Sequence, residues 1–415
     1  MNNKHPDRGR RGFLRAAAAA AAWRSLGLAV PYARFLPAGL LPVVAGAAGE
    51  DILANLGKTG LKLLSDRPIN AETPAHLLDD AVTPSSRMFV RNNGVPPEPV
   101  ADPDAWELSV DGESCLRPQT FALSELKRRF RAVTLQLQLE CAGNGRAEFR
   151  PRTSGNQWTT GAIACPEWTG VRLADVLSHC GVASNAIYVA YRSADTHLSG
   201  DPKKDPISRG APVAKALERE SLLAFAMNGA PIPAIHGAPL RLIVSGWPAS
   251  VSGKWLKQVL VRDRVHDGEK MNEDAYRLPC EPVAPGTKVP DDQTCIIGSM
   301  PVRSLVTFPE SGSRVPQRSP MTLRGHAWAG DRVVTRVEVS TDFGATWQKA
   351  RVKAPVNRLA WQHFDTEIKF PQPGYYEVWA RATDSSGRAQ PMLVPGWNAK
   401  GYLNNACHRI AVQVV

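Results

Sequence analysis

The sequence predicts a mixed α+β domain followed by an all-β domain of the immunoglobulin-like sandwich type. In the first part, residues 106–112 alternate between apolar and polar positions like a strand, whereas residues 123–130 have helical spacing. The second part contains alternating stretches separated by turns, with few helical segments between them. These stretches are residues 333–340, 375–384 and 410–415.

Composition and punctuation place the boundaries of the two domains. The 415 residues are 43% hydrophobic and 21% charged, which is typical of a globular protein with more than one domain. Residues 51–105 are rich in Pro, Asn and Asp and are expected to be irregular chain. Residues 280–292 turn to Pro, Gly and charge, which indicates a linker or a wrapping arm. We therefore expect domains at residues 49–295 and 296–415.

Residues 1–48 have the pattern of an export signal. Arg10 and Arg11 precede an alanine run, and small residues follow around Ala45. Paired arginines are typical of the twin-arginine route, which carries folded proteins and so lets a cofactor be inserted before export. The leader predicts a periplasmic protein that holds a cofactor. No other stretch reaches the roughly 20 apolar residues of a membrane helix, so an integral membrane protein is not expected.

The positive charge is concentrated in this leader. The chain has a formal net charge of +11, and residues 1–48 hold seven lysines and arginines against Asp7 alone. The remaining excess is mild, so the sequence gives little support for a nucleic-acid partner. It suits an enzyme with a small anionic substrate, although a solvated basic surface explains it equally well.

The seven cysteines form no CxxC pair and no zinc-ligand spacing, and at least one must be unpaired. Cys407 and His408 match the end of a c-type haem attachment site, but Asn404 stands where the first cysteine belongs, so we expect no haem on this chain. Cys141 follows an alternating strand and begins a glycine-containing loop that leads to Arg146. Taken alone, Cys141 would be read as a buried structural cysteine.

Several separated motifs in order change this interpretation. They are Met88 to Gly94 (MFVRNNG), Glu140 to Arg146 (ECAGNGR), His236 to Arg241 (HGAPLR), Gly246-Trp247, Ser252 to Leu256 (SGKWL) and Trp397 to Gly401 (WNAKG). Together they resemble the sulfite oxidase family of molybdenum enzymes over nearly the whole chain after the leader. The resemblance implies a sulfite-oxidase-type molybdopterin-binding domain and a C-terminal domain that serves for dimerisation.

The resemblance also implies a molybdenum–molybdopterin cofactor. Cys141 matches the cysteine whose thiolate binds molybdenum, and soft sulfur donors suit this metal. Arg241 and Lys254 can pair with a phosphate, and Gly253 permits close approach of the backbone. The positions that match cofactor-holding residues are Phe89, Val90, Arg91, Asn92, Asn93, Asp195, His236, Arg241, Ser252, Gly253 and Lys254.

Four residues match the substrate side of the family's site. Arg91 and Arg146 supply guanidinium groups, which fit oxyanion geometry better than ammonium groups do. Tyr276 stands where the family has an active-site tyrosine, an alignment that depends on its spacing from Cys141. Lys400 replaces a family arginine and keeps the charge but loses the bidentate fork. Asn93 stands where several members have histidine, which together with Lys400 leaves the substrate less determined than the cofactor.

The function implied by the resemblance is oxidation of sulfite to sulfate, with electrons passed to an external c-type cytochrome. A homodimer or a complex with a cytochrome subunit is expected by the same resemblance. Within the family, the molybdenum subunit of a sulfane dehydrogenase is an alternative, because Arg91 to Gly94 fits that branch at least as well. A reductase of oxidised methionine is a third possibility. From a different class, the chain could be an exported, non-enzymatic binding protein, which cofactor content would exclude.

Overall fold

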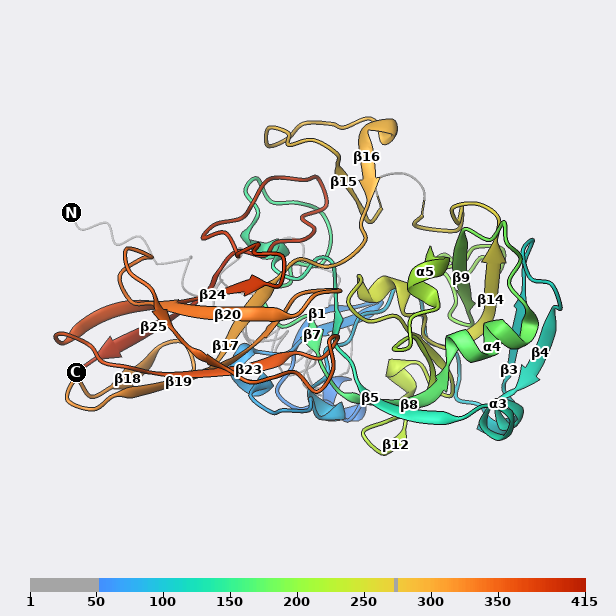
Figure 1. Ribbon diagram of the computed structural model, residues 1–415, viewed down its shortest axis with the longest axis horizontal. Helices are drawn as coiled ribbons and strands as arrows, with labels where there is room; N and C mark the ends of the chain where they lie inside the picture. Colours follow the sequence, from blue (N-terminus) through green and yellow to red (C-terminus); the bar gives the residue numbers. More distant parts are fainter. Residues whose placement is uncertain (1–51, 272–274) are drawn as a thin grey trace, which may run out of the picture. The chain divides into compact units, whose positions relative to one another are not determined.

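The computed structural model of the chain describes residues 52–271 and 275–415 (Figure 1). The expected leader, residues 1–48, lies outside the described residues. Within the described part, no helix is both long and apolar enough to cross a membrane.

The first domain is built on two sheets. One is ordered β10-β9-β14-β3-β4, and within it only the pairing of β14 with β3 is parallel. Its strands are β3 (Glu107–Asp111), β4 (Gln119–Ala122), β9 (Tyr188–Ser193), β10 (Gly210–Pro212) and β14 (Leu256–Arg262). The other is ordered β12-β11-β8-β5, with β13 also paired to β11. Its strands are β5 (Ala132–Gln136), β8 (Glu167–Arg172), β11 (Leu222–Met227), β12 (Ala230–Pro231) and β13 (Arg241–Ile243).

Short helices and one large core join these sheets. The α-helices are α3 (Leu123–Arg129), α4 (Leu173–Cys180) and α5 (Val213–Ala216). Alternating apolar positions of both sheets, such as Leu108 in β3 and Leu223 in β11, meet the apolar faces of α3 and α4 in this core. Further single turns of 3₁₀ helix are η3 (Ala75–Leu78), η4 (Ser85–Arg87), η5 (Pro103–Ala105), η6 (Arg146–Glu148), η7 (Ala234–His236), η8 (Ala249–Val251) and η9 (Asp291–Gln293).

Two local predictions were wrong. Part of the segment expected to be irregular forms an antiparallel hairpin of β1 (Lys62–Asp66) and β2 (Ile69–Glu72), which packs its apolar side against Val90 and Ile235. The alternation at residues 134–140 predicts one strand, but pairing moves from β5 to a separate short strand, β6 (Leu139–Glu140), which pairs with β7 (Ile163–Ala164). Pairing with other segments decided both cases, because the local sequence pattern of each segment is compatible with the predicted structure and with the observed one.

The second domain is made of two β-sheets around a shared core (Figure 1). The four-stranded sheet is ordered β17-β19-β23-β22, and the five-stranded sheet β18-β25-β24-β20-β21. Inward residues such as Leu323 of β19 and Val378 of β24 fill the space between them. The strands are β17 (Arg303–Phe308), β18 (Ser313–Val315), β19 (Met321–Trp328), β20 (Val334–Ser340), β21 (Gln348–Lys349), β22 (Arg351–Val352), β23 (Gln362–Ile368), β24 (Gly374–Asp384) and β25 (His408–Val414).

A buried carboxylate ties the second domain to the strand that leads to Cys141. Glu140 is 2% exposed and accepts hydrogen bonds from Arg303 Nη1 at 2.8 Å, from Trp328 Nε1 at 2.7 Å and from Asn144 Nδ2 at 3.0 Å. Loss of one partner from such a buried pair typically costs about 3–5 kcal/mol, because the other charge is left unpaired. The loop that begins at Cys141 is therefore held from both domains.

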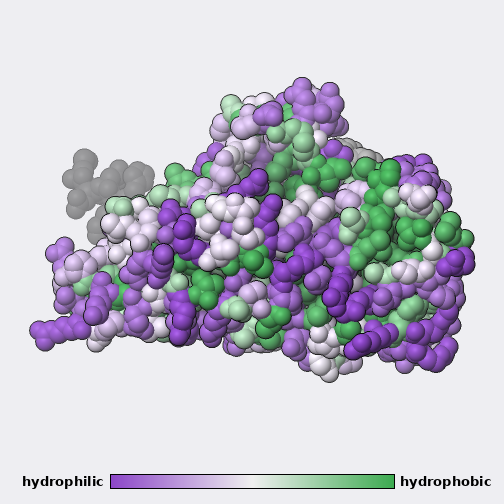
Figure 2. All heavy atoms as spheres, in the orientation of Figure 1, coloured by the Kyte–Doolittle hydropathy of each residue, from purple (hydrophilic) through white to green (hydrophobic). Residues whose placement is uncertain are grey.

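The segment between the domains is an arm closed by a disulfide. Its strands β15 (Arg277–Pro279) and β16 (Thr294–Ile296) pair antiparallel, and Cys280 is bonded to Cys295. Figure 2 shows mixed polarity on the visible face, with hydrophobic residues gathered over the region of β9, β14 and α5. Ile187, Leu217 and Val265 flank these three elements and are 50%, 37% and 44% exposed. Exposed apolar side chains of this kind are common on folded proteins.

Candidate functional site

The Cys141 loop is fixed by backbone contacts and by close packing at a glycine. Cys141 N donates to Ala162 O at 2.9 Å, and the chain then turns through Gly145, whose φ is +85°. A Cβ on Gly145 would lie 2.8 Å from Asn404 Nδ2, which itself donates to Gly145 O at 2.9 Å. Glycine is needed here both for the left-handed backbone and for this approach. The loop therefore places Cys141, 7% exposed, at the wall of a cavity.

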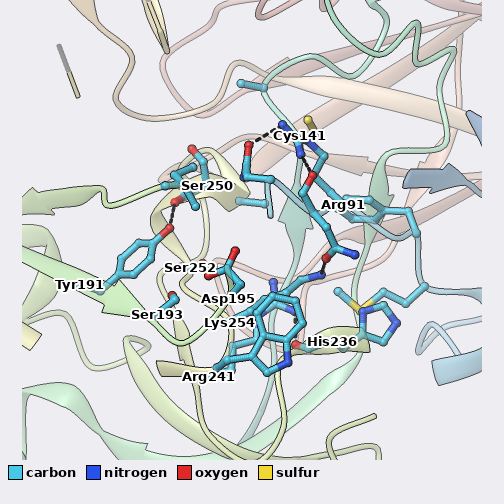
Figure 3. Close-up of a pocket in the computed structure, with 18 of the residues that line it drawn as sticks. Arg91, Cys141, Tyr191, Ser193, Asp195, His236, Arg241, Ser250, Ser252 and Lys254 are labelled. Atoms are coloured by element: carbon cyan, nitrogen blue, oxygen red, sulfur yellow. Dashed lines mark hydrogen bonds between the residues drawn. The ribbon is translucent and has the colours of Figure 1, made fainter. Parts of the chain in front are cut away.

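This cavity brings together most of the residues predicted from the sequence (Figure 3). The predicted residues that line it are Phe89, Arg91, Asn92, Asn93, Cys141, Asp195, His236, Arg241, Ser252, Lys254 and Tyr276. In Figure 3, Cys141 lies at one end, and His236, Arg241 and Lys254 lie at the other. We call the first the thiol end, made of Cys141, Arg91 and Tyr276, and the second the cation end, made of His236, Arg241 and Lys254.

The cation end is held by carbonyl groups of η7 and its flanks. Arg241 Nη1 donates to His236 O at 2.9 Å, and Lys254 Nζ donates to Ile235 O at 2.8 Å and to Asn92 Oδ1 at 2.6 Å. His236 is completely buried and Arg241 is 3% exposed. Yet His236 Nδ1 and Arg241 Nε have no hydrogen-bond partner within residues 52–271 and 275–415. Both side chains line the cavity, so a ligand with polar atoms bound there would provide the missing partners.

Charge at this end leads to the same conclusion. Burial lowers the pKa of Arg241 to about 9 and lowers that of Lys254 well below its usual range. The acidic side chain on the cavity wall is Asp195, whose own pKa burial raises to about 6, against the opposing effect of Lys254. Several cations are thus buried against one weak acid, and an anion bound between them would restore their charged forms.

Two of the predicted cofactor positions act from behind the wall. Val90 is completely buried and forms an isolated β-bridge with Ala71, with backbone hydrogen bonds of 2.9 Å in both directions, so it supports the segment that carries Phe89 and Arg91. Gly253 does not line the cavity, but the ring of Tyr191 does. A Cβ on Gly253 would lie 2.5 Å from this ring. Tyr191 in turn donates to Ser250 O at 2.7 Å. Gly253 therefore lets this ring close the cavity.

Arg91 is the guanidinium group at the thiol end. Its Nη2 donates to Asn93 Oδ1 at 2.8 Å, and its Nη1 donates to the carbonyl of Asn92. Lys270 Nζ also donates to Asn93 Oδ1, at 3.0 Å. Asn93 Oδ1 thus accepts hydrogen bonds from two cationic side chains beside the cavity.

Arg146 and Lys400 are not among the residues that line the cavity. Arg146 is 7% exposed, and its Nε donates to Lys400 O at 2.6 Å and its Nη1 to Asn156 O at 3.0 Å. The guanidinium lies 5.2 Å from the ring centre of Tyr402, which stacks on Tyr276 at 5.3 Å. Arg146 therefore reaches the thiol end through two stacked rings.

Sequence reasoning missed three basic residues around the cavity, one of which is Lys270, the donor to Asn93 Oδ1. Arg209 is 1% exposed, lies 4.2 Å from the ring centre of Tyr276 on a cation–π contact, and donates from Nη1 to Lys270 O at 2.8 Å. Lys58 is 6% exposed and contacts His236. None of the three belongs to a recognisable motif, and a lone arginine or lysine gives no sequence signal of burial.

Comparison with known proteins agrees with this geometry. Residues 94–270 match the family described as "Oxidoreductase molybdopterin binding domain", and residues 294–415 match "Mo-co oxidoreductase dimerisation domain". Sulfite oxidase of Gallus gallus is 36% identical over 367 residues, which cover 84% of this chain and 77% of that protein. The chain belongs to the sulfite oxidase family. This confirms the family predicted from the separated motifs.

Other relatives in the sulfite oxidase family differ in length and in named activity. Mitochondrial sulfite oxidase of Mus musculus is 34% identical over 369 residues, or 86% of this chain, and the chain spans 66% of its length. Nitrate reductase [NAD(P)H] of Hordeum vulgare is 32% identical over 376 residues, covering 85% of this chain and 42% of that protein. The crystal structure of the sulfane dehydrogenase SoxCD from Paracoccus pantotrophus matches with a TM-score of 0.70 and 25% identity, over 93% of each chain.

The residues present fit the molybdenum cofactor that the family model implies. The unpartnered donors of His236 and Arg241 and the ammonium of Lys254 suit a phosphate group. Cys141 supplies a soft sulfur ligand at the other end of the same cavity. The separation of a thiol from an anion site is what a metal–pterin–phosphate cofactor requires.

Proposed function

We propose that the chain is an exported, molybdenum-dependent sulfite dehydrogenase that oxidises sulfite to sulfate. The observation that carries this proposal is the single cavity that joins the Cys141 thiol and Arg91 to a buried cation end. When bound, the molybdenum cofactor supplies oxygen-atom transfer coupled to a two-electron redox change. Its electrons pass to an external c-type cytochrome, and this chain carries no haem.

The protein's own residues bind and orient the reactants. His236, Arg241, Ser252 and Lys254 hold the phosphate end of the cofactor, and Cys141 binds the metal as a thiolate. Arg91 attracts and orients the sulfite oxyanion beside Cys141, and Tyr276 offers a phenol hydrogen-bonding group on the same wall. Because Arg146 and Lys400 lie outside the wall, they act on the substrate through Tyr402 and Tyr276 or through the approach to the site.

Export and assembly form part of the same proposal. The twin-arginine leader directs the folded protein to the periplasm, and the Cys280–Cys295 disulfide supports an oxidising compartment. We interpret the two-sheet domain as an immunoglobulin-like sandwich that pairs two copies of the chain or holds a cytochrome subunit. Neither arrangement requires nucleic acid or membrane insertion.

The test is sulfite-dependent reduction of an added c-type cytochrome by the purified mature protein, with metal analysis of the same sample. Turnover with about one molybdenum per chain is expected, and Cys141→Ser should abolish it while leaving the protein folded and exported. Cys165→Ser is the matched control, because Cys165 is also a buried free cysteine but lies away from the cavity. Full activity of Cys141→Ser would contradict the assignment of the metal ligand.

The second candidate is oxidation of protein-bound sulfane sulfur, favoured by the structural likeness to the sulfane dehydrogenase complex. Molybdenum-containing protein without sulfite turnover, but active on a persulfide carried by a partner protein, would support it. Activity only in reducing methionine sulfoxide would instead support the reductase alternative. Correctly exported protein without molybdenum would favour a non-enzymatic binding protein.

A further inference from the structure

Lys58 is a buried lysine that sits behind the cation end of the cavity. It follows the turn after Leu53, and its backbone N donates to Leu53 O at 2.8 Å. Its ammonium group donates to Ser85 O at 2.6 Å and to Met88 O at 3.0 Å, and it contacts His236 Nε2 at short range. Lys58 lies upstream of residues 94–270, which match the molybdopterin-binding family.

The number of donors on this ammonium group determines the state of the histidine. An ammonium group has three N–H donors, and Lys58 has three acceptors: two carbonyl oxygens and His236 Nε2. While Lys58 is charged, His236 Nε2 offers its lone pair to the ammonium group, so in the neutral ring the proton is on Nδ1. His236 Nδ1 is buried, and it has no partner in the part of the chain that the structure describes. His236 lines the cavity, so this N–H is available to a bound ligand.

The placement of Lys58 also affects charge. The other cations that act on His236 are Lys254 and Arg241, and Asp195 is the carboxylate on the cavity wall. The two carbonyl groups that Lys58 binds carry no charge, and within residues 52–271 and 275–415 no carboxylate forms an ion pair with it. A buried lysine is normally paired, because burial of an unpaired ammonium is costly. An anion at the cation end would provide the missing counter-charge.

We propose that Lys58 is a positioning residue for the cofactor: it fixes the ring and the tautomer of His236 so that Nδ1–H is donated to the bound cofactor. The proposal rests on the proposed function only in naming molybdopterin as the acceptor. The lysine also adds a positive charge behind the phosphate-binding residues. It acts through His236 and does not touch the cavity itself.

Two readouts test the proposal on the full-length exported protein. The first is ¹⁵N NMR of histidine-labelled protein, with the His236 signals identified by their loss in His236→Gln. The second is molybdenum and pterin content per chain after purification. Lys58→Met is the test variant, and Lys58→Arg asks whether the charge alone restores function. Lys215→Met is the control, because Lys215 is also buried, at 5% exposure, but pairs with Glu218 and Asp331 away from the cavity.

Wild-type protein should show His236 protonated on Nδ1, and Lys58→Met should shift the tautomer equilibrium. The variant should retain about 10-fold less cofactor, since charge-assisted hydrogen bonds contribute roughly this factor. Lys58→Arg should recover part of it, and Lys215→Met should keep full cofactor content. An Nδ1 tautomer and a cofactor content that are unchanged in Lys58→Met would overturn the proposal.

The tautomer readout separates this inference from the proposed function. If purified wild-type protein contains no molybdenum, the proposed function fails, while the His236 signals still report on Lys58. If wild-type protein contains molybdenum and His236 carries its proton on Nε2, the inference fails and the proposed function stands.

Discussion

The basic side chains at the two ends of the cavity differ in how many of their hydrogen-bond donors have acceptors within the chain. At the cation end, the ring of His236 and the guanidinium of Arg241 keep donors that no described residue accepts. At the thiol end, the guanidinium of Arg91 already donates to acceptors of Asn92 and Asn93. A ligand would therefore provide missing partners at the cation end, whereas the guanidinium at the thiol end already has partners in the chain.

The two arrangements give a bound ligand different net binding energy. A ligand at the cation end gains charge-assisted hydrogen bonds without breaking existing ones. A substrate at the thiol end must compete with the chain's own carbonyl and amide oxygens, and so binds more weakly and exchanges more readily. A permanently held cofactor needs the first arrangement, and a substrate that turns over needs the second. Substitutions at the two ends should therefore fail in different ways.

The largest effect is expected for Arg241→Met. Removal of a buried guanidinium with an unpartnered Nε should reduce molybdenum and pterin content by about 100-fold, since a hydrogen bond to a charged group and its charge are both lost. Metal analysis of the purified variant measures this. Arg192→Met, which removes an exposed arginine paired with Asp205, should leave the cofactor content unchanged. Normal cofactor content in Arg241→Met would contradict the assignment of the cation end as the part of the cavity that binds the cofactor.

Arg91→Met should affect substrate and spare the cofactor. We expect kcat/KM for sulfite to fall about 100-fold, mostly through KM, because a charge-assisted contact to the oxyanion is lost. Molybdenum content should stay close to that of the wild type. Arg146→Met should cost less, since its guanidinium does not line the cavity. Steady-state kinetics of both variants decide the matter, and a larger loss for Arg146→Met would mean that this side chain turns toward the substrate.

A smaller effect is expected for Arg209→Met, which removes the cation 4.2 Å from the Tyr276 ring centre. Contacts of this kind are worth roughly 1–2 kcal/mol when they are desolvated, so kcat should fall about 10-fold. KM for sulfite should stay close to that of the wild type, because Arg209 acts through the ring of Tyr276 and does not line the cavity. A lowered kcat that is matched by an equal loss of folded protein in denaturant unfolding would indicate that Arg209 only stabilises the fold.

The smallest effect concerns stability against pH in protein produced without the cofactor. Burial lowers the pKa of Lys58 to about 7 and that of Lys270 to about 8, from 10.5. Between pH 7 and 9 the unfolded chain therefore binds more protons than the folded chain, so the free energy of unfolding should rise. The slope is at most about 1.4 kcal/mol per pH unit for each proton. Asp195, with a pKa near 6, acts in the opposite direction only at lower pH.

Denaturant unfolding at several pH values measures this slope. Lys58→Met should reduce it, and the anionic cofactor should reduce it further in the complete protein, because a bound anion keeps the lysines charged. A slope that is the same in Lys58→Met and in the wild type would show that Lys58 is solvated. The cation end would then lose one of the charges that distinguish it.

Several elements could be predicted from local pattern. The strand at 106–112, the helix at 123–130 and the alternating strands of residues 333–415 appear as β3, α3 and strands such as β20, β24 and β25. The hairpin β1–β2 and the break between β5 and β6 could not, because partner strands distant in sequence decide them. The domain boundary near residue 295 remains a prediction.

The site divides in the same way. Motif residues such as Cys141, His236 and Arg241 could be assigned because they stand at family spacings, and the fold brings them to one cavity. Lys58 and Arg209 could not, since their importance depends on burial and on the direction of their side chains. Asn404, which stands where a c-type haem attachment site would have its first cysteine, has a structural role that the sequence did not show. It donates a hydrogen bond to the carbonyl of Gly145 in the Cys141 loop.

By itself, the sequence determined the α+β and all-β order of the domains, the family and the residue types of the cofactor site, because periodicity and motif spacing are properties of the chain. The tertiary structure alone decided that Arg146 lies against the ring of Tyr402, that Glu140 joins both domains and that Lys58 contacts His236. The physical reason is that the state of a buried polar group depends on its partners in space. Those partners come from segments more than a hundred residues apart.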